Sequence, residues 1–201
     1  MHYAISHTTL EQEFLHITPR RKLLKHTLLH VKEGLVLVKL GKQEYAIEPG
    51  SSFWLPFNAL CSLTYFPNSK VEKVDVSCRV TTQMPVQGGY VQLNELCQAI
   101  VTRLGDHTSN EQAKAELLAV LRTEFSSMAP KLHQSKLNAL INQWHWDILD
   151  SALSREQQLV LKMREASKMM LSGKKRPQVI EQLFDGDEIT FTQLEAVLLG
   201  K

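Results

Sequence analysis

The fold is decided by residues 31–56, which read VKEGLVLVKLGKQEYAIEPGSSFWLP. Short runs rich in β-branched and aromatic residues alternate there with glycine and Pro-Gly turns, a pattern typical of neighbouring strands in a sheet. Gly34 and Gly50 suit turn positions with a positive φ, and Pro49 suits the first corner of a type II turn. The stretch therefore predicts strands joined by tight turns.

The same pattern continues on both sides of this stretch. Six runs are predicted to be strands, at 27–31, 35–40, 44–47, 53–55, 61–66 and 71–76. Short strands at such even spacing favour a sandwich or a small barrel.

After residue 85 the apolar residues recur about every 3.6 positions, which is the period of amphipathic helices. Six helices are expected, and most of them carry a residue suited to start or stop a helix. In chain order, the first helix is expected from Tyr90 to Gly105, the second after the cap Ser109 with Gln112, and the third from Leu137 through Trp144 to Ile148. The fourth is expected after the cap Ser154 with Gln157, the fifth from Pro177, and the last after the cap Thr190. The sequence thus predicts an α+β protein whose β-half is followed by an all-α half.

Composition excludes several classes of protein. The 201 residues are 43% hydrophobic and 22% charged, which is enough for a compact core and argues against disorder. No apolar run approaches the roughly 18 residues that cross a bilayer, and the first residues lack the order of a secretory signal. We therefore expect a cytoplasmic protein without a membrane partner. Three widely spaced cysteines, and the absence of a phosphate-binding loop or a Ser/His/Asp order, predict no disulfide framework, no cofactor and no enzyme activity.

The order of turns resembles the N-terminal effector domain of AraC-family transcription regulators. In that family a Glu-Gly turn is followed by a Pro-Gly turn and an aromatic strand that ends in proline, as at Glu33-Gly34, Pro49-Gly50 and Pro56 here. The resemblance covers roughly residues 20–80 and implies a cupin-like β-barrel, or jelly roll. It also implies three domains: a cupin-like β-barrel at 1–85, a helical dimerisation or connecting segment at 86–130, and a degenerate helix-turn-helix-like unit at 131–201.

Metal binding is not expected, although enzymatic cupins hold a metal through two histidines one residue apart and a third on a later strand. Here His26 and His30 are four residues apart, which separates them by about 13 Å along a strand. Cys61 stands where the later histidine would follow. We therefore expect these histidines to make ordinary hydrogen bonds.

A small-molecule effector could bind inside such a barrel. The aromatic residues Tyr45, Trp54 and Tyr65 are the candidates to line the cavity. Alternatively, these side chains fill the core, because small barrels can close their interior by themselves.

Dimerisation is implied for the first two helices, since the family uses the corresponding pair for that purpose. Leu117, Leu118 and Leu121 lie on one apolar face, which would be buried against a second copy. The alternative is that this face packs on the β-half of the same chain.

DNA contact is suggested by the basic residues 155–176, which hold seven Lys or Arg and two acidic residues. Residues 162–170, KMREASKMM, resemble the family's linker helix, and Phe191 with Gly200 reproduces a spacing of its recognition helix. Residues 177–201 depart from the family because they hold one basic and five acidic residues. The expected phosphate contacts are Lys162, Arg164, Lys168, Lys174, Lys175 and Arg176. Alternatively, the last three form a solvated helix end.

Two functions remain open from the sequence. The first is an AraC-like transcription regulator with a metal-free sensor, which contacts DNA as a homodimer. The second is an interaction module or antagonist that forms a heterodimer with a full-length regulator and does not read DNA. Trp146 and His145 point away from the apolar face of their predicted helix and form a candidate contact surface.

Overall fold

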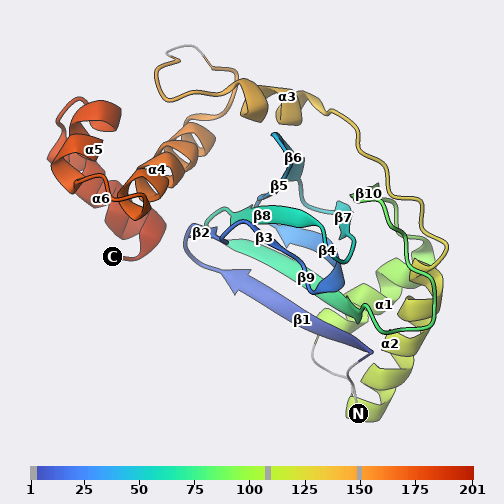
Figure 1. Ribbon diagram of the computed structural model, residues 1–201. Helices are drawn as coiled ribbons and strands as arrows, with labels where there is room; N and C mark the ends of the chain where they lie inside the picture. The colour runs from blue at the N-terminus through green and yellow to red at the C-terminus, as the bar shows by residue number, and fades with distance from the viewer. Residues whose placement is uncertain (1–3, 107–109, 149–150) are drawn as a thin grey trace.

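The structure is a computed structural model that describes residues 4–106, 110–148 and 151–201, with ten strands and six helices over these ranges (Figure 1). The strands form two antiparallel sheets. Sheet A has the order β1 (Ile5–Gln12), β9 (Ser69–Ser77), β4 (Lys25–Glu33), β7 (Ser52–Leu55) and β10 (Gly89–Val91). Sheet B has the order β2 (His16–Ile17), β8 (Leu60–Tyr65), β5 (Val36–Leu40) and β6 (Gln43–Ile47), with β3 (Arg21–Lys22) also paired to β8.

The two sheets pack face to face because their side chains alternate between two cores. On β5, Val36 and Val38 point into the core between the sheets, whereas Leu37 points to the outer face of sheet B. Over the described ranges the sheets are not joined into a closed cylinder. The expected β-barrel is therefore corrected to a two-sheet sandwich, while the six predicted strands are confirmed as β4 to β9.

Helices cover both outer faces of the sandwich, and Figure 1 shows the first two and the last three helices at opposite ends of the molecule, with the remaining helix between them. On the outer face of sheet A lie α1 (Glu95–Gly105) and α2 (Glu111–Phe125). On the side of sheet B lie α3 (Lys136–Gln143), α4 (Arg155–Leu171), α5 (Arg176–Phe184) and α6 (Glu188–Leu199). The last three helices contact one another pairwise and share a core with Leu35, Leu37 and Ala46 of the sandwich. The fold is thus a sandwich flanked by two helical groups.

Several helix ends differ from the sequence expectations. Tyr90 lies on β10, and the first helix begins later, after the cap Asn94. The third helix ends at Gln143, because the backbone of Trp144 is extended, so Ile148 is not part of it. Asp187, rather than Thr190, caps the last helix. At the third helix the apolar period thus continues past the last hydrogen-bonded turn, whereas the other two differences concern helix starts.

Other helix signals have different outcomes. The capping box of Ser154 and Gln157 is confirmed. The predicted cap Ser109 lies outside the described residues, and the side chain of Asn110 accepts the hydrogen bond at the start of α2. The domain boundaries stay a prediction. None of the described helices combines the length and the apolar character that crossing a membrane would require.

The free edge of β6 is covered by side chains instead of by another strand. Asn142 exchanges two hydrogen bonds of 2.8 Å with the backbone N–H and C=O of Glu44. Asn138 accepts from the N–H of Ala46 at 2.7 Å, and the Tyr90 hydroxyl donates to the C=O of Ala46 at 2.7 Å. All four outward peptide groups of these two residues are therefore paired, which fixes α3 along the strand.

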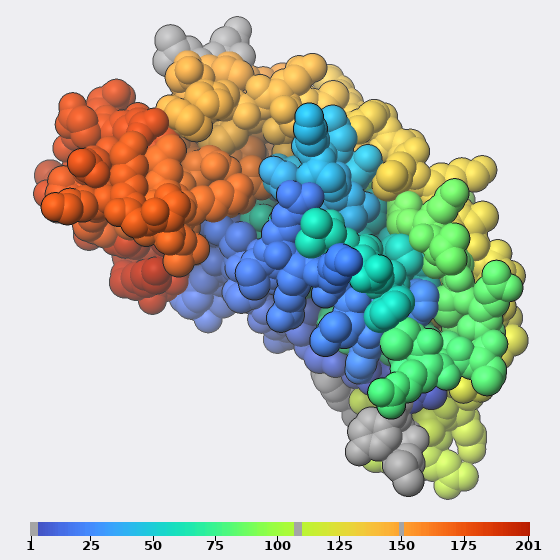
Figure 2. Space-filling model, viewed as in Figure 1, coloured from blue at the N-terminus to red at the C-terminus, as the bar shows by residue number. Residues whose placement is uncertain are grey.

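The chain crosses from one helical group to the other along this edge. Figure 2 shows the yellow and orange segment that leads from α2 through α3 to α4 running across the outside of the sandwich. Its placement therefore decides where the last three helices lie.

We expect Asn138→Ala to lower the free energy of unfolding by about 2 kcal/mol, because the buried N–H of Ala46 would lose its acceptor. The measurement is urea unfolding followed by circular dichroism. Gln143→Ala is the control, since it removes an exposed side chain from the same helix and should change stability by less than about 0.5 kcal/mol. Equal losses for the two variants would contradict this account of the edge.

Candidate functional site

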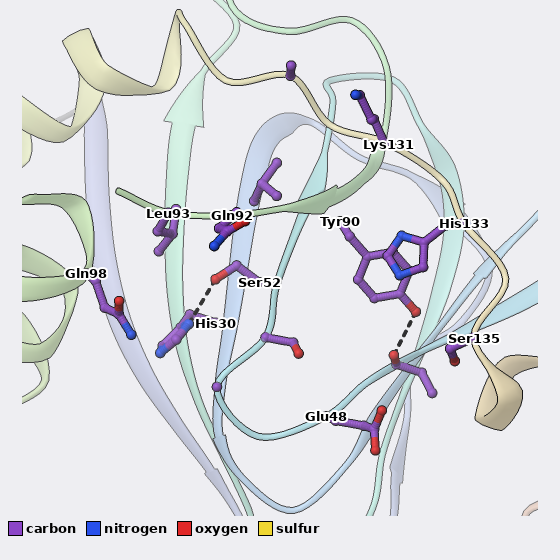
Figure 3. A pocket seen from close by; sticks show the side chains of 15 residues that line it. His30, Glu48, Ser52, Tyr90, Gln92, Leu93, Gln98, Lys131, His133 and Ser135 are labelled. Carbon is purple, nitrogen blue, oxygen red and sulfur yellow. Dashed lines mark hydrogen bonds between the residues drawn. The ribbon is translucent and has the colours of Figure 1, made fainter. Parts of the chain in front are cut away.

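A cleft of about 690 Å³ opens beside β10, where the edge of sheet A, the start of α1 and residues 129–135 meet (Figure 3). This volume lies within the range of sites for small molecules, about 300–1,000 Å³. Its lining is mostly polar and comes from five separate segments of the chain. The side chains that offer hydrogen bonds are His30, Glu48, Ser51, Ser52, Tyr90, Gln92, Gln98, Lys131, His133 and Ser135.

One wall of the cleft belongs to a row of polar residues that crosses sheet A. Thr9, Glu72, His30 and Ser52 stand at matching positions on β1, β9, β4 and β7. The Nδ1 atom of His30 lies 2.9 Å from the Ser52 hydroxyl, a contact that Figure 3 marks. Burial lowers the pKa of His30, the Lys32 charge lowers it further, and Glu72 opposes both. At neutral pH this wall therefore presents an uncharged imidazole.

The far end of the row is a buried carboxylate. Glu72 is fully buried, and its Oε2 atom lies 2.7 Å from both His7 Nε2 and the Thr9 hydroxyl. Lys32 Nζ lies 3.5 Å from the other oxygen. Gly105 ends α1 directly above, where an added Cβ would stand 2.3 Å from the same oxygen. The row thus connects the cleft with the end of α1.

The opposite wall is aromatic and is held by residues 129–135. The ring centroids of Tyr90 and His133 lie 4.2 Å apart, and Figure 3 shows the two rings next to each other. The backbones of Tyr90 and Lys131 exchange hydrogen bonds of 2.9 and 3.0 Å. Burial raises the pKa of Tyr90, so its hydroxyl keeps the proton that it donates to Ala46. A flat wall facing amide, hydroxyl and imidazole groups suits a small molecule rich in hydroxyl or carboxyl groups.

The residues do not fit the metal site of an enzymatic cupin. His26 stacks on Trp54, and its Nδ1 accepts from the N–H of Phe57 at 3.0 Å. His30 faces Ser52, and Cys61 is buried in the other core, between the sheets. Within the described ranges, no three His, Cys, Asp or Glu side chains are grouped so that they could hold a metal ion.

Comparison with solved structures finds whole-chain likeness to ToxT from Vibrio cholerae, an AraC-family regulator. Its apo K231A form has a TM-score of 0.44 at 10% identity over 98% of this chain and 94% of that chain. KdgF from a Halomonas species scores 0.35 at 15% identity over 38% and 72% of the two chains. A cupin superfamily protein from Desulfitobacterium hafniense scores 0.35 at 9% identity over 37% and 68%. These scores and identities are low, and the likeness assigns no function to this chain.

Sequence comparison adds no family to this. No family model matches the chain, and no curated protein matches it.

The aromatic residues expected to line an effector cavity lie elsewhere. Trp54 points to the outer face of sheet A, packs against Phe125 of α2 and donates to the C=O of Pro85 at 3.0 Å. Tyr45 and Tyr65 fill the core between the sheets, and burial raises the pKa of Tyr65. None of the three lines the cleft. They contribute to the core, as the alternative interpretation held.

The leucines expected at a dimer interface face their own sandwich. Leu118 and Leu121 are buried in the core between sheet A and the helices, and Leu117 packs against its border. The expectation that this face joins a second copy is therefore corrected, because sheet A already covers it.

The cations expected to contact phosphate are mostly paired within the chain. Arg164 is buried, and its Nη1 atom lies 3.1 and 3.0 Å from the two carboxylate oxygens of Glu44, which excludes it from a DNA surface. Lys168 pairs with Glu165 at 2.8 Å, and Arg176 pairs with Glu195.

The other three predicted cations lie around α4 and α5. Lys162 lies over the ring of Phe184, 4.8 Å from its centroid. Lys174 contacts Gln182, and Lys175 is exposed at the start of α5. The six residues therefore do not form one continuous basic surface.

We expect Arg164→Ala to lower the free energy of unfolding by about 3 kcal/mol, because it leaves the Glu44 carboxylate buried without its partner. The double variant Arg164→Met with Glu44→Gln should recover most of this loss. The free energy of unfolding of both variants is measured by chemical denaturation. The control is Arg155→Ala, at the exposed start of α4. If Arg155→Ala lowered the free energy of unfolding as much as Arg164→Ala, the ion pair of Arg164 with Glu44 would not be what holds α4 in place.

Proposed function

We propose that this chain is a regulatory protein with the layout of an AraC-type regulator, which binds a small polar molecule in the cleft and transmits the occupied state to helices α4 to α6. The observation that carries this proposal is that residues 129–135 line the cleft and then lead directly into α3. A ligand that touches Lys131 or His133 therefore touches the segment that positions the last four helices. The proposal includes no catalysis, metal or membrane.

A short path of contacts supports this transmission. Tyr90 lines the cleft, and its hydroxyl lies 3.1–3.2 Å from the side-chain amide of Asn138 on α3. Asn138 and Asn142 hold the edge of β6, and Glu44 on that strand holds Arg164 of α4. A ligand that moves Tyr90 would thus act on one connected set of hydrogen bonds.

We propose that the output is a contact with another protein. Helices α4, α5 and α6 form a three-helix unit, but α6 begins with the exposed Glu188, and residues 177–200 contain no Lys or Arg. Carboxylates beside DNA phosphates weaken binding, which disfavours α6 as a helix that enters the major groove. Its outward side instead exposes Ile189 and Val197 at 74% and 68%. The partner would be a related regulator, in keeping with the second sequence hypothesis.

Direct DNA contact is the second candidate, and the turn before α5 favours it. Lys174 and Lys175 stand together there, and Lys175 is exposed. A regulator that used this turn would contact DNA phosphates without reading bases.

Ligand binding is tested by a thermal-shift screen with neutral sugars, sugar acids and amino acids, followed by calorimetry on any compound that raises the melting temperature. We expect Gln98→Ala to lower the affinity for such a compound at least about 5-fold, since one lost hydrogen bond is worth about 1 kcal/mol. Gln98 is exposed, so the fold should survive. Gln134→Ala, on an exposed side chain outside the cleft lining, is the matched control. No shift with any compound, or equal affinity in both variants, would refute a ligand cleft.

DNA contact is tested by gel shifts of genomic fragments at low and high salt. The proposal expects no retarded complex with the chain alone. If a complex forms, weakens as salt is added and is lost in the Lys174→Glu, Lys175→Glu variant, the output is contact with DNA and not with another protein.

A further inference from the structure

A second, smaller groove lies on the other side of the molecule from α1, between the β5–β6 hairpin, the end of α3 and the middle of α4. Its volume is about 250 Å³, below the range for drug-sized ligands. Lys39 and Lys42 come from the hairpin, Trp144 and Trp146 from the segment after α3, and Lys168 from α4. The groove therefore joins the sandwich to the helical unit and suits a compact group.

Positive charge exceeds negative charge in this groove. Four cationic side chains and two carboxylates line it, so two positive charges remain after pairing. Glu44 is paired with Arg164, and Glu165 is paired with Lys168. The excess thus corresponds to the two hairpin lysines, for which the described part of the chain supplies no carboxylate within ion-pair distance.

The floor of the groove holds a fixed donor. The Arg164 side chain is only 6% exposed, with Nη1 on Glu44 and Nε 3.3 Å from Glu165. Among the described residues, no acceptor pairs with its remaining nitrogen, Nη2. Two ion pairs hold the guanidinium in place, so an incoming acceptor meets a donor that does not need to be ordered.

We propose that this groove binds the phosphate monoester group of a small metabolite. At neutral pH such a group carries a charge of about −1.5 to −2 and three strong acceptor oxygens, which matches two lysines and one guanidinium nitrogen. A carboxylate would neutralise only half of the excess charge. Bound there, the phosphate would tie Lys39 and Lys42 of the hairpin to Arg164 of α4. This inference does not rest on the cleft or on its ligand.

The test is calorimetric titration of the full chain with inorganic phosphate, glucose 6-phosphate, glucose and gluconate at low ionic strength. We expect both phosphate compounds to bind, and glucose and gluconate to bind at least 10-fold more weakly. Indole fluorescence should change on phosphate binding, because Trp144 and Trp146 line the groove. Equal affinity of the two phosphate compounds assigns the site to the phosphate itself, and tighter binding of glucose 6-phosphate assigns it to the ester.

The decisive variant is Lys39→Gln with Lys42→Gln, which should lower the affinity for both phosphate compounds at least 10-fold. Lys22→Gln with Lys25→Gln is the matched control, because it removes the same charge from exposed strand residues outside the groove and should change affinity less than 2-fold. Gln98→Ala should leave phosphate binding unchanged, which separates this site from the cleft. Equal effects of the two lysine pairs, gluconate as tight as phosphate, or no binding of either phosphate compound would overturn the proposal.

Discussion

The edge of β6 is the constraint on which the rest of this structure depends. A sheet edge that is covered by other parts of the chain must pair its outward peptide groups, and each unpaired group would cost about 1–3 kcal/mol. Here Asn138, Asn142 and Tyr90 pair those of Glu44 and Ala46. Side chains that are four residues apart on one helix turn can reach alternate residues of a strand, so the edge fixes the register of α3. The Glu44 side chain then holds α4 through Arg164.

Both sites that we describe meet this short strand. Ala46 lines the cleft, and Glu44, two residues earlier, lines the phosphate groove. An occupant of either site would therefore act on hydrogen bonds at neighbouring residues of the same strand. Two ligands that favour the same placement of α3 and α4 would bind cooperatively, and by linkage each would strengthen the other by the same factor. The strand offers a physical route between the sites that needs no larger movement of the sandwich.

Much of the fold could be predicted from sequence, whereas most of the cleft could not. The strands β4 to β9 were predictable because glycine and proline turns separate runs of β-branched residues. Strand β1 was missed, since His7 and Thr9 replace the apolar residues that usually mark a buried face, and Glu72 is their partner from a distant strand. Tyr90 fitted a helical period by chance, although its backbone pairs with β7. The cleft combines short segments from five places in the chain, and no local pattern indicates such a meeting.

The basic stretch 155–176 shows why a charge count along the chain does not predict a charged surface. Arg164 pairs with Glu44, which is 120 residues earlier, and Arg176 pairs with Glu195 on the neighbouring helix. Both cations serve packing inside the helical unit and its attachment to sheet B. In the groove beside α4, the cations without a carboxylate partner among the described residues are Lys39 and Lys42, in a hairpin whose local sequence is not notably basic. Part of the positive charge beside α4 thus comes from the sandwich, which a charge count over residues 155–176 does not include.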